Sequence, residues 1–132
     1  MPMNPAREGT WYAPVRFEVR EEHVSRFARA VGDDGSFVPP TFVTAPEISA
    51  GLAQAVADAE LGLDFARVVH SEQEYEWSRP VRVGDVLEVV SQVESIRTKG
   101  GHEFLTLRTE IRDADGDLVV VARSSLVVRG NT

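Results

Sequence analysis

Alternating apolar and polar positions predict one strand near the start of the chain and four more after residue 68. Val15, Phe17 and Val19 alternate with charged residues, which is the period of a half-buried strand. The same period recurs at 68–78 and 105–111, and the segments 86–97 and 118–129 are also interpreted as strands. Short turns rich in Gly, Pro and Asp separate these four, so neighbouring strands should pair as antiparallel hairpins.

Two other stretches have helical spacing. Apolar residues recur every three or four positions between residues 24 and 31, and Gly32 is a typical helix end. A second helix over 46–59 is predicted to open with a capping box formed by Thr44 and Glu47. Its expected apolar face consists of Ile48, Leu52, Ala55, Val56 and Ala59. The small side chains along this helix would let a sheet wrap closely around it.

The order of strand, helix, helix and four strands predicts an α+β fold, in which an antiparallel sheet wraps around the second helix. A parallel βαβ fold is excluded, because the hairpin turns after residue 80 leave no room for crossover helices. The first ten residues contain prolines and a glycine and show no periodicity. We expect residues 1–10 to form a flexible arm ahead of a single domain over 11–132.

The chain carries a net charge of −7 and contains no cysteine. This acidity argues against nucleic-acid binding, since phosphate contacts need a basic surface. Without thiols, disulfides and thiolate metal sites are excluded, and a reducing cytoplasm is the expected location. No apolar run is long enough to span a bilayer, and the first ten residues lack the apolar core of a signal peptide. We therefore expect a cytoplasmic protein that binds neither membrane nor nucleic acid.

Several segments resemble the MaoC-like dehydratase family. Residues 27–33 are similar to the start of its hydratase motif, 39–42 to the entry of its central helix, and 69–77 with 79–85 to the strand and turn that follow. The resemblance extends over 9–129 and is nearest to the FAS1-like dehydratases, or MaoC N-terminal-domain proteins, of actinobacteria. These include the non-catalytic subunit of a (3R)-hydroxyacyl carrier-protein dehydratase. The resemblance implies a single hot-dog fold.

The resemblance also implies an activity, the addition or removal of water at a trans-2-enoyl thioester without a cofactor. The family uses an aspartate and a histidine on a Gly-Asp-x-Asn-Pro-x-His loop to move the proton. Gly32 and Asp33 match the first two positions, but Val38 stands where the histidine is expected. Since valine neither accepts nor donates a proton, this pair cannot form within the chain. Asp33 could orient water alone or could cap the turn at the helix end.

His70 is the candidate for a substitute base, because it lies on the strand 68–78, which in the family fold pairs with the same strand of a partner subunit. It could reach the pocket of a neighbouring subunit, or it could form a structural hydrogen bond across the two-fold axis. His23 and His102 are expected to be solvated. The strand 68–78 also carries several carboxylates on the face that His70 should share, and these are expected to be solvated, so no metal site is predicted.

By the same resemblance, the substrate should bind where the chain enters the central helix, at Pro40, Thr41, Phe42 and Glu47. Backbone amides at a helix start can hold the oxygen of a thioester. Glu47 also has two other interpretations, as the cap of the helix and as the carboxylate of a hot-dog thioesterase.

The leading hypothesis is a subunit of a MaoC-like (3R)-hydroxyacyl-thioester dehydratase or enoyl hydratase that takes its histidine from a partner. Its ligand would be an acyl-CoA or an acyl carrier protein thioester. The alternatives are a catalytically silent acyl-binding or scaffolding module and an acyl thioesterase. A homodimer, or a heterodimer with a second hot-dog subunit, should form through the strand 68–78, because a long unpaired edge favours association.

Overall fold

The computed structural model describes residues 2–130 and contains five strands and three α-helices. The strands are β1 (Val15–Glu18), β2 (Val68–Trp77), β3 (Val86–Lys99), β4 (His102–Arg112) and β5 (Leu118–Val128). The α-helices are α1 (Glu21–Val31), α2 (Thr44–Ala50) and α3 (Leu52–Ala57). Three short 3-10 turns accompany them, η1 (Pro5–Arg7), η2 (Pro40–Val43) and η3 (Phe65–Arg67). The predicted α+β layout is confirmed.

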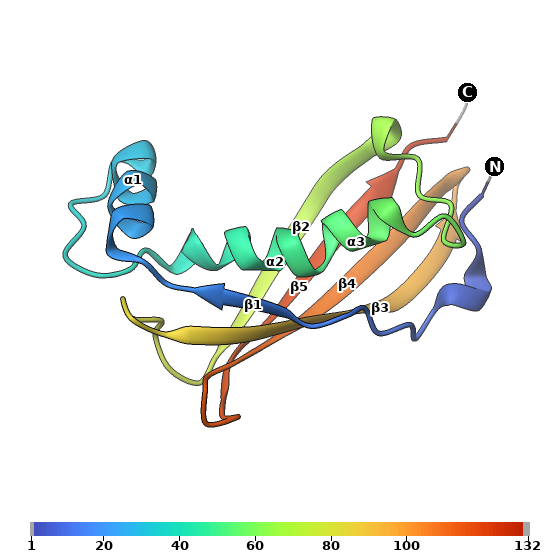
Figure 1. Ribbon diagram of the computed structural model, residues 1–132. Helices are drawn as coiled ribbons and strands as arrows, with labels where there is room; N and C mark the ends of the chain where they lie inside the picture. Colours follow the sequence, from blue (N-terminus) through green and yellow to red (C-terminus); the bar gives the residue numbers. More distant parts are fainter. Residues whose placement is uncertain (1, 131–132) are drawn as a thin grey trace.

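The strands form one antiparallel sheet in the order β1-β3-β4-β5-β2, so β1 and β2 lie at its two edges. Helices α2 and α3 run in line across one face of this sheet, and α1 stands at one end (Figure 1). Alternate residues of β4 point to the helices and are buried, as the sequence pattern predicts: Leu105, Leu107, Thr109 and Ile111. None of the helices among residues 2–130 is long and apolar enough to cross a membrane.

Helix α1 begins and ends where the sequence predicts. Glu21 and Glu22 occupy its first turn, where carboxylates interact favourably with the helix dipole. Gly32 ends it with φ 76°, a left-handed conformation that glycine adopts without steric cost. The N–H of Asp33 then donates to the carbonyl of Ala28 (2.8 Å), which closes the last turn.

The central helix is broken at Gly51, so the predicted continuous helix over 46–59 is wrong. Gly51 has φ −102° and ψ −83°, outside the helical region, and it separates α2 from α3. The predicted apolar face is also wrong in part, since Ile48 and Val56 are 47% and 42% exposed. The alanines at the sheet contact are Ala50 and Ala55, which are fully buried.

Close contact with the sheet explains the glycine at the break. A Cβ atom at Gly51 would lie 3.0 Å from Oγ of Ser91 and 3.1 Å from the carbonyl oxygen of Glu47. Ser91 cannot easily turn away, because its buried hydroxyl is hydrogen-bonded to that of Thr109 (2.6 Å). A residue without a side chain at this position therefore lets the helix pass close over β3 without displacing Ser91.

Replacing Gly51 by Ala should lower the free energy of unfolding by about 1–3 kcal/mol, because the added methyl group overpacks the helix–sheet contact. Urea denaturation monitored by circular dichroism would measure the loss. In a Ser91→Ala background the same replacement should cost less, since the nearest atom has been removed. A Gly51→Ala chain as stable as the wild type would contradict this explanation of the break.

Residues 2–10 make contacts that a flexible arm would not make. Met3 is only 3% exposed, and its N–H donates to Glu103 (2.8 Å). The guanidinium of Arg7 pairs with Asp58 (2.9 Å), which also accepts a hydrogen bond from Tyr12 (2.9 Å). Although burial acts in the opposite direction, these two hydrogen bonds hold the pKa of Asp58 below its ordinary value. This segment therefore covers the end of the helix layer.

Candidate functional site

A cavity of about 270 Å³ lies between the central helix and the sheet, on the side of the edge strand β2. One part of its wall is apolar and consists of Ile48, Leu52, Phe65, Val68, Leu107 and Leu126. The other part is polar and consists of Thr44, Glu47, His70, Gln73, Thr109 and Ser124. A mainly apolar hollow with a few convergent polar groups is typical of a small-molecule site.

Glu47 belongs to this cavity, so the predicted capping box is wrong. It is 4% exposed, and its carboxyl group contacts Nε2 of Gln73 (2.9 and 3.1 Å) and Oγ of Ser124 (2.6 Å). The first turn of α2 has no side-chain cap. Thr44 instead shares a hydrogen bond with the hydroxyl of Tyr75 (2.8 Å), and burial raises the pKa of Tyr75. Contacts with β2 and β5, remote in sequence, outweigh the local capping geometry.

A bulge in β2 brings His70 into the same cavity. Strict alternation puts His70 and Gln73 on opposite faces, but the pairing register with β5 shifts between His70 and Glu72. His70 pairs with Leu126 and Gln73 with Ser124, two residues apart on β5 and hence on one face. Both side chains therefore line the cavity, and the predicted placement of His70 among the outward-facing glutamates is wrong.

The loop that carries Asp33 and Val38 lies away from this cavity. Asp33 is exposed, and its carboxylate accepts a hydrogen bond from the N–H of Gly35 (2.9 Å), which shapes the turn. Val38 and Pro40 line a second hollow of about 390 Å³, together with Trp77 at the end of β2. The structure thus brings Glu47 and His70 together and keeps Asp33 apart from them.

The remaining candidate residues lie outside the cavity. Thr41 is exposed on η2, whereas Phe42 is fully buried and belongs to the core. The Phe42 ring is 5.5 Å from that of Phe27 and 4.8 Å from that of His23, both edge-on. His23 is therefore half-buried against aromatic rings, not solvated as expected. His102 accepts a hydrogen bond at Nδ1 from the N–H of Gly130 (3.0 Å).

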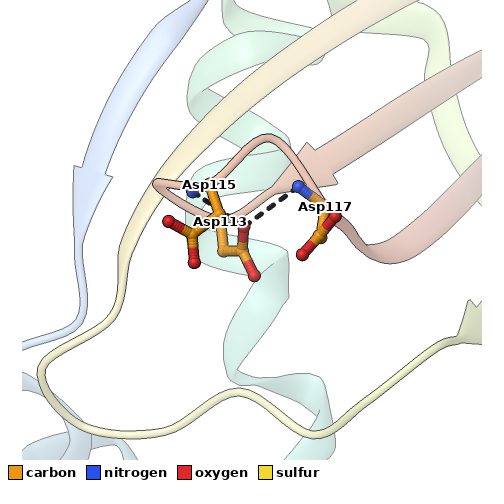
Figure 2. A group of neighbouring side chains, drawn as sticks. All are labelled: Asp113, Asp115 and Asp117. Carbon is orange, nitrogen blue, oxygen red and sulfur yellow. Dashed lines mark hydrogen bonds between the residues drawn. The ribbon is translucent and has the colours of Figure 1, made fainter.

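Three carboxylates gather at the β4–β5 turn, where Asp113, Asp115 and Asp117 lie with ligand atoms within 4.8 Å of one another (Figure 2). One oxygen of Asp113 accepts hydrogen bonds from the N–H groups of Asp115 and Asp117 (both 3.0 Å). Its other oxygen is 3.5 Å from the guanidinium of Arg79. These bonds give Asp113 a structural role, because they shape the β4–β5 turn and link it to the loop that carries Arg79.

Comparison with known proteins assigns the chain to a family. Residues 34–122 match the family described as "FAS1-like, dehydratase domain region". The chain belongs to this family. A UPF0336 protein of Streptomyces coelicolor is 36% identical over 146 residues, covering 98% of this chain and 97% of the relative. A UPF0336 protein of Leifsonia xyli is 38% identical, covering 99% of both chains.

Solved structures confirm the hot-dog fold. A chain of the C-terminally truncated HadBC complex, a (3R)-hydroxyacyl-ACP dehydratase of Mycobacterium tuberculosis, is 27% identical with a TM-score of 0.74. That match covers 92% of this chain and 96% of the HadBC chain. A MaoC-like dehydratase is 22% identical with a TM-score of 0.82, over 95% of this chain and 43% of the other, and shows the fold alone. The predicted resemblance to MaoC-like and FAS1-like dehydratases is therefore confirmed.

Proposed function

We propose that the chain is a subunit of a (3R)-hydroxyacyl-thioester dehydratase, or enoyl hydratase, that supplies an acyl-binding cavity and depends on a partner for the Asp–His loop. The reaction would add the hydroxyl group of a water molecule at C3 of a trans-2-enoyl thioester and the proton of that water at C2, or reverse that addition. Family membership and the mixed apolar and polar cavity support this proposal. Val38 at the histidine position supports the need for a partner.

The position of the two hollows along β2 carries the proposal. Within the described chain, β2 pairs with β5 on one side only, and its other edge is unpaired. The cavity adjoins the start of this strand through Val68 and His70. The second hollow, which Val38 and the rest of its loop line, adjoins the end of the strand through Trp77. Antiparallel pairing of two such edges across a two-fold axis brings the start of one strand to the end of the other. The loop of a partner subunit would then lie against the cavity of this chain.

In this arrangement each chain would have a separate task. The apolar wall would hold the acyl chain of an acyl-CoA or an acyl carrier protein thioester. The partner's aspartate and histidine would position and deprotonate the water. His70 faces the cavity from its rim, where a base could reach a ligand, and Glu47 contributes polar atoms to its wall. Asp33 is exposed and does not line this cavity, so it would act only in the cavity of the partner.

The assembly has its own test. We expect a dimer at micromolar concentration in sedimentation experiments, formed through the free edge of β2. Val69→Lys should shift it toward monomer, because Val69 is exposed on this strand and edge lysines block pairing. Val31→Lys is the matched control, since Val31 is also an exposed valine but lies on α1. A wild-type monomer, or equal effects of the two substitutions, would contradict the interface.

Two experiments separate the alternatives. The leading proposal is tested by a binding assay with an enoyl-CoA and by a turnover assay. The turnover assay is run with and without a hot-dog protein encoded by a neighbouring gene. Binding without turnover by the chain alone, followed by turnover with the partner, supports it. Binding that no partner converts into turnover would favour a silent acyl-binding module. Release of free thiol from an acyl-CoA would favour a thioesterase.

A further inference from the structure

Three polar side chains of the cavity wall form a closed triangle of short contacts. Oγ of Ser124 is 2.6 Å from Oε2 of Glu47 and 2.7 Å from Oε1 of Gln73. Nε2 of Gln73 is 2.9 Å and 3.1 Å from the two carboxyl oxygens of Glu47. Each side of the triangle has the length of a hydrogen bond, so each side needs one hydrogen atom.

An ionised Glu47 leaves this triangle one hydrogen short. The amide of Gln73 supplies the hydrogen toward Glu47, and the hydroxyl of Ser124 has a single hydrogen for its two oxygen neighbours. One of the two O···O contacts would then join two acceptors. Exchanging the oxygen and nitrogen of the Gln73 amide does not help, because the Gln73–Glu47 contact then joins two acceptors. In both orientations the missing hydrogen must come from the carboxyl group.

We propose that Glu47 is a neutral carboxylic acid at pH 7 and completes a hydrogen-bonded ring in which it donates to Ser124, Ser124 to Gln73, and Gln73 back to Glu47. The surroundings agree with a neutral group. Among the described residues that line the cavity, His70 is the one side chain able to carry a positive charge, and it is exposed at the rim. A buried carboxylate without a cation beside it would be costly.

Resting on the proposed function, this ring defines the kind of ligand the wall accepts. A neutral wall whose hydrogens are already used within the ring suits an uncharged acyl chain. A neutral acid is a poor nucleophile and a poor base, so the ring argues against Glu47 as the carboxylate of a thioesterase. We therefore assign Glu47 as a positioning residue that keeps the polar wall uncharged and fixes Gln73 and Ser124.

Infrared spectroscopy of protein labelled with 13C at glutamate carboxyl carbons tests the protonation state without any assay of activity. The wild-type chain at pH 7 should show the C=O band of a protonated carboxylic acid, and Glu47→Gln should remove it. Glu110→Gln is the matched control and should leave the band unchanged, because Glu110 is ion-paired with Arg108 and Arg112. A wild-type spectrum without the band at pH 7 would overturn the proposal, whatever the chain does with thioesters.

A melting series gives an independent readout. An unfolded glutamate is ionised above about pH 4.3, so a carboxyl group that stays protonated in the folded chain loses stability as the pH rises. The melting temperature of the wild type relative to Glu47→Gln should then fall by roughly 5 °C per pH unit between pH 5 and the pH at which Glu47 ionises. Glu47→Gln leaves His70 and Tyr75 in place, and Tyr75, whose pKa burial raises above its ordinary value, stays protonated over this range. A difference that stays constant from pH 5 to 8 would also overturn the proposal.

Discussion

A trans-2-enoyl thioester should be hydrated about 10²–10⁴-fold more slowly by the purified chain alone than by its complex with a hot-dog partner that has an intact Asp–His loop. A positioned base supplies an acceleration of this size, and Val38 cannot act as one. The cavity itself remains intact in the isolated chain, so the thioester should still bind. Loss of absorbance from the conjugated enoyl thioester measures the rate, and titration calorimetry measures the binding.

Two substitutions show which residues carry any residual activity. His70→Ala and Asp33→Asn distinguish a base within this chain from one supplied by the partner. Robust hydration by the isolated chain that neither change reduces would refute the partner requirement and both candidate residues. Loss of such activity in His70→Ala alone would identify His70 as the base.

Phe42→Ala should lower the free energy of unfolding by about 3–5 kcal/mol, which corresponds to roughly 10–20 °C in melting temperature. The Phe42 ring, on η2 just before α2, is fully buried, and three rings pack around it, those of Phe17, His23 and Phe27. Its removal leaves a cavity that these side chains can fill only in part. The cost therefore includes both the lost burial and the cavity.

Phe37→Ala is the control for this experiment, because Phe37 is 85% exposed and lies only five residues earlier. Its stability should change by no more than about 0.5 kcal/mol. Chemical denaturation of both variants gives the two values. Equal losses would show that Phe42 does not anchor the core, and would also reopen its assignment as a substrate-binding residue.

The sheet could be predicted from the sequence because its signals are local. Alternation of apolar and polar residues identifies β1, β2 and β4, and the turns at Gly100, Gly101 and Gly116 fix the hairpins between β3, β4 and β5. Helix α1 has its stop signal in Gly32. These features depend on residues a few positions apart, and the structure reproduces them.

The site could not be predicted in the same way, because it depends on contacts between distant segments. The bulge that turns His70 inward is visible only in the pairing of β2 with β5. The spacing of Thr44 and Glu47 fits a capping box, yet both side chains bond across to strands. Ser124 was missed as a site residue, although a serine in the apolar run 118–128 is a signal that could have drawn attention to it.

The pairing of β2 with β5 also sets an order for folding. β3, β4 and β5 are joined by short turns and can pair as soon as each is made, whereas β2 must close a much longer loop before it pairs. Gln73 and Ser124, whose contact closes the cavity wall, are 51 positions apart. In a nascent chain Glu47 therefore stays exposed to water until β5 has left the ribosome. The cavity wall is thus completed only after β5 has been made, long after the central helix.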